Sequence, residues 1–210
     1  MQEQIDPDLL EGVDAQYVDR PISATLREYA QFIDRGTADY YLEMFMSLGF
    51  VQGTVARGSE HRLSCFFSEV RGRDGVLLPY RYAGKLNPAL EFTDDLRTLM
   101  RIVEHVTGFR YNSCLANLYR NGDDYIGWHS DATSGLVPAS SIASMSLGAP
   151  RWFNIRNKTG IPYTSFRIRT GHGSMVIMGT NMQDRYDHSI SAERGALHPR
   201  INLTFRCIRA

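Results

Sequence analysis

Arg200-Ile201-Asn202-Leu203-Thr204-Phe205-Arg206 is the stretch of this 210-residue chain that says most about its fold. Its β-branched and aromatic composition predicts a final strand that runs on to Ile208. Side chains alternate between the two faces of a strand. The apolar face, which must line a core, is formed by Ile201, Leu203, Phe205 and Cys207. The opposite face is polar, and its side chains point together into a cavity or into solvent. It is formed by Arg200, Asn202, Thr204 and Arg206.

Similar short runs precede this stretch from residue 110 onward, and clusters of turn residues separate them. The predicted strands are Leu115–Tyr119, Ile142–Leu147, Trp152–Arg156, Phe166–Arg169 and Ser174–Met178. Evenly spaced strands without helices between them predict a barrel or a two-sheet jelly roll. We therefore expect an α+β protein with a double-stranded β-helix core at about 110–210.

Two helices are predicted on the N-terminal side, and we expect them to pack against the outside of one sheet. The first begins at a Thr37 cap and ends before Gly49; its apolar stripe consists of Tyr41, Met44, Phe45 and Leu48. The second runs from a Thr93 cap to Gly108; its apolar stripe consists of Leu96, Leu99, Met100, Val103 and Val106.

Composition and charge place the chain among globular proteins. With 43% hydrophobic and 22% charged residues it is neither disordered nor collagen-like. The formal net charge is zero, but residues 1–60 carry 4 basic and 11 acidic side chains, whereas residues 151–210 carry 10 basic and 3 acidic ones. This asymmetry predicts an anionic ligand near the C-terminus. We expect an acidic N-terminal arm at 1–20 and one domain at 21–210.

Cysteine usage and the N-terminal sequence bear on the compartment. The three cysteines, Cys65, Cys114 and Cys207, are far apart and form no C-x-x-C motif, which predicts a reducing environment without a disulfide framework. The N-terminus lacks the features of a signal peptide, and no apolar run reaches the length of a membrane span. We expect a cytoplasmic or nuclear protein with no membrane partner.

Three residues have the donor types of a facial-triad iron(II) site, which needs two imidazoles and one carboxylate. They are His129, Asp131 and His188. Arg200 follows His188 by twelve residues, and a guanidinium fits the distal carboxylate of a 2-oxoacid that chelates iron at its other end. The simpler interpretation is that His129 is a loop residue and that a backbone partner satisfies His188.

The residues also form motifs that resemble those of the AlkB-type iron(II)/2-oxoglutarate-dependent dioxygenases, best from Asn112 onward. The motifs are Asn117-Leu118-Tyr119, residues 122–131, residues 142–148, His172-Gly173-Ser174, Tyr186-Asp187-His188-Ser189 and residues 199–206. The R-x-N-x-T-F-R pattern is typical of AlkB members. Among them, the chain is most similar to the subgroup that demethylates DNA or RNA bases.

This resemblance implies a role for individual residues. His129, Asp131 and His188 would bind iron(II), and Arg200, with Tyr119 beside it, would hold the distal carboxylate of 2-oxoglutarate. The chelating end of the cosubstrate would be held, or the site supported, by Asn117, Asn202 and Arg206. A nucleotide-recognition segment is expected at about 55–90. There Tyr82 would stack on a flipped base opposite the His129 ring, and Arg62 is a further candidate for substrate binding.

The implied reaction is the oxidative demethylation of alkylated bases, which consumes dioxygen and releases formaldehyde, succinate and carbon dioxide. Single strands are the expected substrate, because a base must leave any duplex stack to react, and a monomer is expected. Two features depart from the subgroup. Asp131 is followed by Ala132 where repair members carry an acidic residue, and residues 50–78 show no convincing arginine-rich wedge hairpin. Phe66, Phe67 and Arg62 are the candidates for that role, and the alternative is that they are structural.

These departures keep two alternatives open. The same chemistry could act on a small molecule or a protein, or the chain could be a nucleic-acid-binding module that has lost turnover. Stimulation of 2-oxoglutarate consumption by a methylated oligonucleotide distinguishes the three functions.

Overall fold

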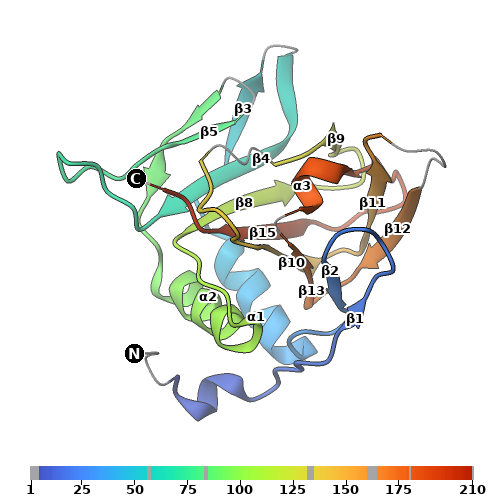
Figure 1. Ribbon diagram of the computed structural model, residues 1–210, viewed down its shortest axis with the longest axis horizontal. Helices are drawn as coiled ribbons and strands as arrows, with labels where there is room; N and C mark the ends of the chain where they lie inside the picture. Colours follow the sequence, from blue (N-terminus) through green and yellow to red (C-terminus); the bar gives the residue numbers. More distant parts are fainter. Residues whose placement is uncertain are drawn as a thin grey trace.

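The computed structural model describes residues 5–55, 58–82, 85–131, 135–159, 165–179 and 181–209, without the side chains of Val55, Arg81, Tyr82 and Lys85. Its strands form two main sheets, and two longer helices lie beneath the larger one (Figure 1). The fold is therefore mostly β-sheet with few helices.

The larger sheet has nine strands. In order across the sheet they are β1 (Val18–Asp19), β2 (Leu26–Tyr29), β13 (Ser174–Met178), β10 (Ile142–Gly148), β15 (Arg200–Arg206), β8 (Ser113–Tyr119), β4 (Gly58–Ser68) and β3 (Val51–Val55), while β7 (Ala89–Leu90) pairs with β4. Apart from the parallel β4–β7 pair, neighbouring strands are antiparallel.

The smaller sheet faces the larger sheet across the interior of the protein. Its order is β12 (Ser165–Thr170), β11 (Arg151–Asn157), β14 (Tyr186–Ile190) and β9 (Ile126–His129). A separate hairpin joins β5 (Tyr80–Tyr82) to β6 (Lys85–Asn87). The short helical turns η1 (Pro7–Leu10) and α3 (Met182–Arg185) complete the elements.

The two faces of β15 divide as the alternation predicts. Ile201, Leu203 and Phe205 belong to a buried apolar cluster that includes side chains of both helices. Arg200, Asn202, Thr204 and Arg206 line a cavity on the other side. The strand ends at Arg206, and Cys207 is half-buried outside the apolar cluster.

Helix α2 (Asp94–Thr107) confirms the predicted bounds. The Thr93 hydroxyl accepts a hydrogen bond from the backbone N–H of Leu96, and Gly108 ends the helix with a φ of 72°, a left-handed conformation that favours glycine. Leu96, Leu99, Met100 and Val103 are buried against the larger sheet.

This cap gives a stability prediction. Replacing Thr93 with alanine removes the acceptor for the Leu96 N–H, and we expect it to lower the free energy of unfolding by about 1 kcal/mol. Urea unfolding followed by far-UV circular dichroism measures this loss. Thr93→Ser keeps the acceptor and should restore most of the stability; equal losses in both variants would show that the cap is not the cause.

Helix α1 (Arg35–Met46) differs from the prediction in the residue that caps its start and in the residues of its buried stripe. Asp34, not Thr37, is the cap, because its carboxylate accepts the N–H of Thr37 at 2.8 Å. The helix therefore begins two residues before Thr37 and includes Gly36. Of the predicted stripe, Tyr41 and Phe45 are buried, whereas Met44 is 40% exposed. Met44 therefore lies outside the buried part of the predicted stripe.

The strands of the N-terminal half were not predicted. Among them β3 and β4 form a hairpin within residues 50–78, the segment in which the sequence shows no arginine-rich wedge hairpin. Phe66 and Phe67 lie in β4 with 1% and 2% exposure, so both are core residues and neither is a wedge. Residues 5–20 run along the molecule, where β1 pairs with β2 and Leu10 and Val13 pack partly against the core.

No helix in the described part of the chain is both long enough and apolar enough to span a membrane.

Candidate active site

A cavity between the two sheets collects nearly all of the predicted site residues. Strands β4, β8, β10 and β15 line it from the larger sheet, and β9, β11 and β14 from the smaller one. The predicted residues that line it are Arg62, Asn117, Tyr119, His129, Asp131, His188, Arg200, Asn202 and Arg206. Tyr82 lies in β5, but its side chain is outside the described residues.

Strand pairing brings the two histidines together. His129 ends β9, His188 lies in β14, and the two residues are direct partners in the antiparallel register. Their ring centroids are 4.3 Å apart. Asp131 follows the end of β9, and one ligand atom from each of the three residues lies within 4.8 Å of the others. Among the described residues this is the one group of histidine, cysteine or acidic side chains with metal-site spacing.

Hydrogen bonds orient two of these three side chains. His129 Nδ1 lies 2.8 Å from the carbonyl oxygen of Gly127, so a proton on Nδ1 donates to that oxygen and makes Nε2 the nitrogen that carries the ring's lone pair. One carboxylate oxygen of Asp131 accepts a hydrogen bond from Arg206 Nη2 at 2.7 Å. The other oxygen, Oδ2, is buried and finds no partner in the described part of the chain.

The charges of the site favour the ligand forms of all three side chains. Burial and, to a smaller extent, the neighbouring His129 lower the pKa of His188 to about 3. Burial also lowers the pKa of His129. Burial alone would raise the pKa of Asp131, but Arg206 and the two histidines outweigh it and hold the pKa at about 2. Two neutral imidazoles and one carboxylate result, which is the state that binds a divalent metal.

Arg200 is buried, and some of its hydrogen-bond donors have no partner among the described residues. The residue is 2% exposed, and its Nη2 donates to the Ser146 hydroxyl at 2.9 Å. Its Nε and Nη1 have no hydrogen-bond partner among the described residues. Burial lowers the pKa of Arg200 to about 10, so the guanidinium stays charged at neutral pH. A buried guanidinium with free donors is costly unless an anion binds it.

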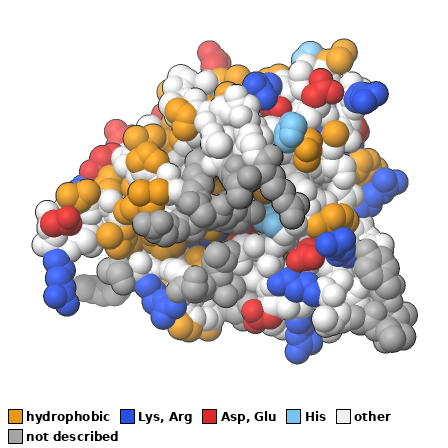
Figure 2. Space-filling view, turned by 90° about the horizontal axis from the view of Figure 1, so that it is seen from above, with side chains coloured by type: hydrophobic (Ala, Val, Ile, Leu, Met, Phe, Trp, Pro, Cys, Tyr) orange, Lys and Arg blue, Asp and Glu red, His pale blue; other side chains and the backbone are white. Residues whose placement is uncertain are grey.

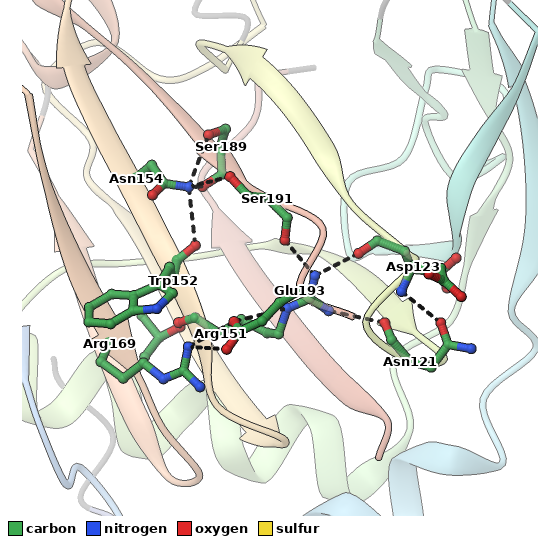
Figure 3. Close-up of polar contacts among 11 residues, drawn as sticks. Asn121, Asp123, Arg151, Trp152, Asn154, Arg169, Ser189, Ser191 and Glu193 are labelled. Atoms are coloured by element: carbon green, nitrogen blue, oxygen red, sulfur yellow. Dashed lines mark hydrogen bonds and ion pairs between the residues drawn. The ribbon is translucent and has the colours of Figure 1, made fainter. Parts of the chain in front are cut away.

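Tyr119 separates Arg200 from a second buried arginine, Arg151 of β11. The guanidinium carbons of Arg200 and Arg151 lie 5.2 Å and 5.7 Å from the Tyr119 ring centroid. Arg151 donates to the backbone carbonyls of Asn121 and Ser191 (Figure 3) and to that of Asp124. Its hydrogen bonds therefore connect loops at this end of the sheet, whereas Arg200 has donors available for a ligand.

The remaining predicted residues are engaged inside the protein. The Asn202 amide donates to the Ser144 hydroxyl and the Met145 carbonyl, and its oxygen accepts from Thr204. This arrangement suits a residue that supports the site.

Arg62 is held in the same way. Arg62 Nε donates to Asn117 Oδ1 at 2.8 Å, and its Nη2 pairs with the buried Glu60 carboxylate at 3.1 Å. Arg62 is therefore fixed at the cavity wall by two partners from β4 and β8.

Comparison with known proteins now adds to this geometry. Residues 26–206 match the 2OG-Fe(II) oxygenase superfamily. The chain belongs to this superfamily.

Several relatives have AlkB-homologue names, as the motifs predicted. Human alpha-ketoglutarate-dependent dioxygenase alkB homolog 3 is 34% identical over 193 residues, which are 86% of this chain and 65% of the relative. The Bos taurus protein of the same name is 37% identical and covers 84% of this chain and 64% of its own length. Human DNA oxidative demethylase ALKBH2 is 34% identical over 137 residues, 62% of this chain and 52% of the relative. The chain thus spans slightly less than two thirds of the alkB homolog 3 proteins.

A solved structure, that of OsALKBH1, shares the fold. It superimposes with a TM-score of 0.61 at 14% identity and covers 90% of this chain and 100% of its own. Members of the 2OG-Fe(II) oxygenase superfamily use iron(II), 2-oxoglutarate and dioxygen. The unpartnered oxygen of Asp131, the two imidazoles and the free donors of Arg200 fit the first two of these groups.

The sequence did not reveal several residues that support the site. Ser144 and Ser146 of β10 hold Asn202 and Arg200. The alternation of β10 could have shown them, since Ala143, Met145 and Leu147 face the helices. Gln183 of α3 accepts a hydrogen bond from the backbone N–H of Asp131 at 2.8 Å. No local pattern marks Gln183, because its partner lies 52 residues away.

Proposed function

We propose that this oxygenase demethylates alkylated bases in DNA or RNA by oxidation, with iron(II), 2-oxoglutarate and dioxygen, and releases formaldehyde, succinate and carbon dioxide. One observation carries the proposal. The same cavity holds a His–Asp–His group with an unpartnered carboxylate oxygen and, on β15, a fully buried arginine with unpartnered donors.

In this proposal His129, Asp131 and His188 hold the metal. When bound, iron(II) with 2-oxoglutarate and dioxygen supplies the power to hydroxylate a C–H bond. The protein's contribution is to keep the ligands in place. Arg206 fixes one oxygen of Asp131 and leaves the other free, Gln183 fixes the backbone of Asp131, and the Gly127 carbonyl orients His129.

Arg200 receives the distal carboxylate of 2-oxoglutarate. Its Nε and Nη1 can make the two parallel hydrogen bonds that a carboxylate accepts, while Ser146 and the Tyr119 ring keep the guanidinium in position. Asn117, Asn202 and Arg206 support the chelating end of the cosubstrate. Phe153, Met178 and Ile190 line the cavity with apolar surface, which limits the entry of water.

Nucleic acid is the proposed substrate because a relative that is 34% identical over 137 residues is named a DNA oxidative demethylase. Tyr82 and the His129 ring would stack on the two sides of a flipped base, and Arg62 at the cavity wall would contact it. A single strand is favoured, since no base pair has to open. Ala132, whose identity differs from the acid of repair members, lies outside the described residues.

The proposal extends to the organisation of the chain. The two facing sheets, with helices α1 and α2 packed on the larger one, support a double-stranded β-helix, or jelly roll. We propose an N-terminal arm at 1–20, a single dioxygenase domain at 21–210, a nucleotide-recognition segment at about 55–90, a monomeric state and a cytoplasmic or nuclear location.

A screen for released formaldehyde tests the proposed reaction. Purified protein with iron(II), ascorbate and 2-oxoglutarate is incubated with oligonucleotides that carry single methylated bases, as DNA and RNA and in single- and double-stranded form. We expect formaldehyde and succinate in equal amounts from at least one single-stranded substrate, and less from its duplex.

Two outcomes would contradict this proposal. If a metabolite or a protein stimulates succinate formation and no methylated oligonucleotide does, the chemistry stands and the substrate class is wrong. If oligonucleotides bind but nothing is turned over, the chain is a binding module.

A further inference from the structure

The outer face of the smaller sheet carries aromatic and basic side chains. Along β11, Phe153 and Ile155 point into the core, so Trp152, Asn154 and Arg156 point outward. Along β12 the outward residues include Arg167 and Arg169, which are both exposed. Trp128 of the edge strand β9 is 42% exposed.

Each tryptophan is stacked against arginine. The guanidinium carbons of Arg167 and Arg169 lie 4.0 Å and 5.0 Å from the Trp152 ring centroid. Figure 3 shows the Trp152 ring beside Arg169 and the outward amide of Asn154. The guanidinium carbon of Arg156 lies 4.4 Å from the Trp128 ring centroid. We call these five residues, Trp128, Arg156, Trp152, Arg167 and Arg169, the Trp–Arg track.

The track has an excess of positive charge. Arg156 pairs with Asp187 at 3.2 Å and Arg169 with Glu193 at 2.8 Å. Arg167 has no ion pair with any residue that the structure describes, and Lys158 lies just beyond β11. Lys and Arg side chains gather on the right of the face in Figure 2, the side on which β11 and β12 lie in Figure 1.

The track leads to the active site. Trp128 directly precedes His129, whose imidazole is in the cavity, and β9 is the edge of its sheet. Trp152 and Trp128 lie two strands and about two residues apart, or roughly 12 Å with ~4.8 Å between strands and ~3.4 Å per residue. Three or four nucleotides span this distance at ~3.4 Å each.

We infer that the Trp–Arg track binds the single-stranded nucleic acid that flanks the reacting nucleotide. The inference rests on the proposed function, and it adds a docking surface outside the cavity. Surfaces that bind single strands combine cations for phosphates with aromatic rings on which unpaired bases stack. The track supplies both, whereas an acidic protein partner would need only the cations.

Binding of a fluorescein-labelled, unmodified 15-mer of thymidylate, measured by fluorescence anisotropy, tests this surface. We expect Trp152→Ala to raise Kd at least about fivefold through the loss of stacking. Arg167→Ala should also raise Kd, and it should reduce the slope of log Kd against log salt by about 0.7 through the loss of one phosphate contact. Trp152→Phe keeps a stacking ring and should restore most of the affinity.

Matched controls come from helix α1, on the other side of the molecule. Arg35→Ala and Tyr40→Ala remove an exposed arginine and an exposed aromatic ring, and both should leave Kd unchanged. The inference is overturned if the wild type does not bind the 15-mer, if the track variants bind it as the wild type does, or if the controls weaken it equally. It is also overturned if poly-glutamate of equal charge competes as well as the oligonucleotide.

A second experiment distinguishes failure of the Trp–Arg track from failure of the proposed function. Formaldehyde release is measured from a methylated trinucleotide, which is too short to reach Trp152 from the cavity. Trp152→Ala and Arg167→Ala should leave kcat on the trinucleotide unchanged and raise KM only for longer strands. Absence of turnover in the wild type contradicts the demethylase proposal, whereas equal KM values for long strands contradict the track.

Discussion

Replacing Asp131 with alanine is expected to reduce 2-oxoglutarate-dependent succinate formation at least about 1000-fold, since loss of a residue that only supports a metal ligand already costs about 10–100-fold. Asp131 supplies the unpartnered oxygen of the His–Asp–His group. The expected variant binds less iron(II) and shows no turnover with any substrate. Succinate release and metal content by atomic absorption measure the two effects.

The same substitution should destabilise the protein without metal. Asp131 is the carboxylate that pairs with Arg206, and the two side chains are 5% and 3% exposed. Removing one partner of a buried ion pair leaves an uncompensated charge and costs about 3–5 kcal/mol. Urea unfolding in the presence of EDTA measures this loss, because the chelator removes the contribution of bound metal.

A double variant separates the two roles of Asp131. Replacing Arg206 with methionine as well removes both charges, and an apolar replacement of a whole buried pair is often neutral. We expect Asp131→Ala/Arg206→Met to regain most of the lost stability and none of the activity. Asp123→Ala, at an exposed aspartate near the site, is the control and should match the wild type. Activity that survives in Asp131→Ala would remove the residue from the metal site.

Replacing Arg200 with methionine is expected to raise KM for 2-oxoglutarate about 100-fold, since a lost partner in a buried charge pair costs ~2–5 kcal/mol. The guanidinium is buried; its Nη2 donates to Ser146, and its Nε and Nη1 have no acceptor among the described residues. Lysine offers only a point charge, and Arg200→Lys should recover little of the affinity. Steady-state succinate formation against 2-oxoglutarate concentration measures KM.

Two controls show whether the distal carboxylate is the partner of Arg200. The wild type should prefer 2-oxoglutarate strongly over 2-oxobutanoate, which lacks that carboxylate, and Arg200→Met should lose the preference. Arg151→Met removes an equally buried arginine whose Nη1 and Nη2 donate to backbone carbonyls. It should lower the free energy of unfolding, whereas Arg200→Met removes an unpaired buried charge and should not. A KM for 2-oxoglutarate that is unchanged in Arg200→Met contradicts the assignment.

Much of the fold follows from local pattern. The predicted bounds of α2 agree with the structure because a cap residue, an apolar stripe and a left-handed glycine all lie within one stretch of chain. The start of α1 was wrong because two residues three apart can both cap a helix, and only the fold selects Asp34. Strand β4 was missed because residues on both of its faces are buried, so its apolar side chains do not alternate cleanly with polar ones.

The cavity residues were predicted for a related reason. Alternation assigns Arg200, Asn202 and Arg206 to one face of a strand without any knowledge of its neighbours. The partners of those residues could not be predicted in this way. Ser146 lies 54 residues from Arg200, and Asp131 lies 75 residues from Arg206.

Local sequence patterns thus predict the type of element, the face of each polar side chain and the chemical types of the metal ligands, because these depend on residues a few positions apart. Long-range strand pairing, in contrast, sets which buried charges are paired and which keep donors without a partner. That difference depends on strand register over long separations in the chain. It distinguishes Arg200, whose Nε and Nη1 have no partner among the described residues, from Arg151, whose Nη1 and Nη2 donate to three backbone carbonyls.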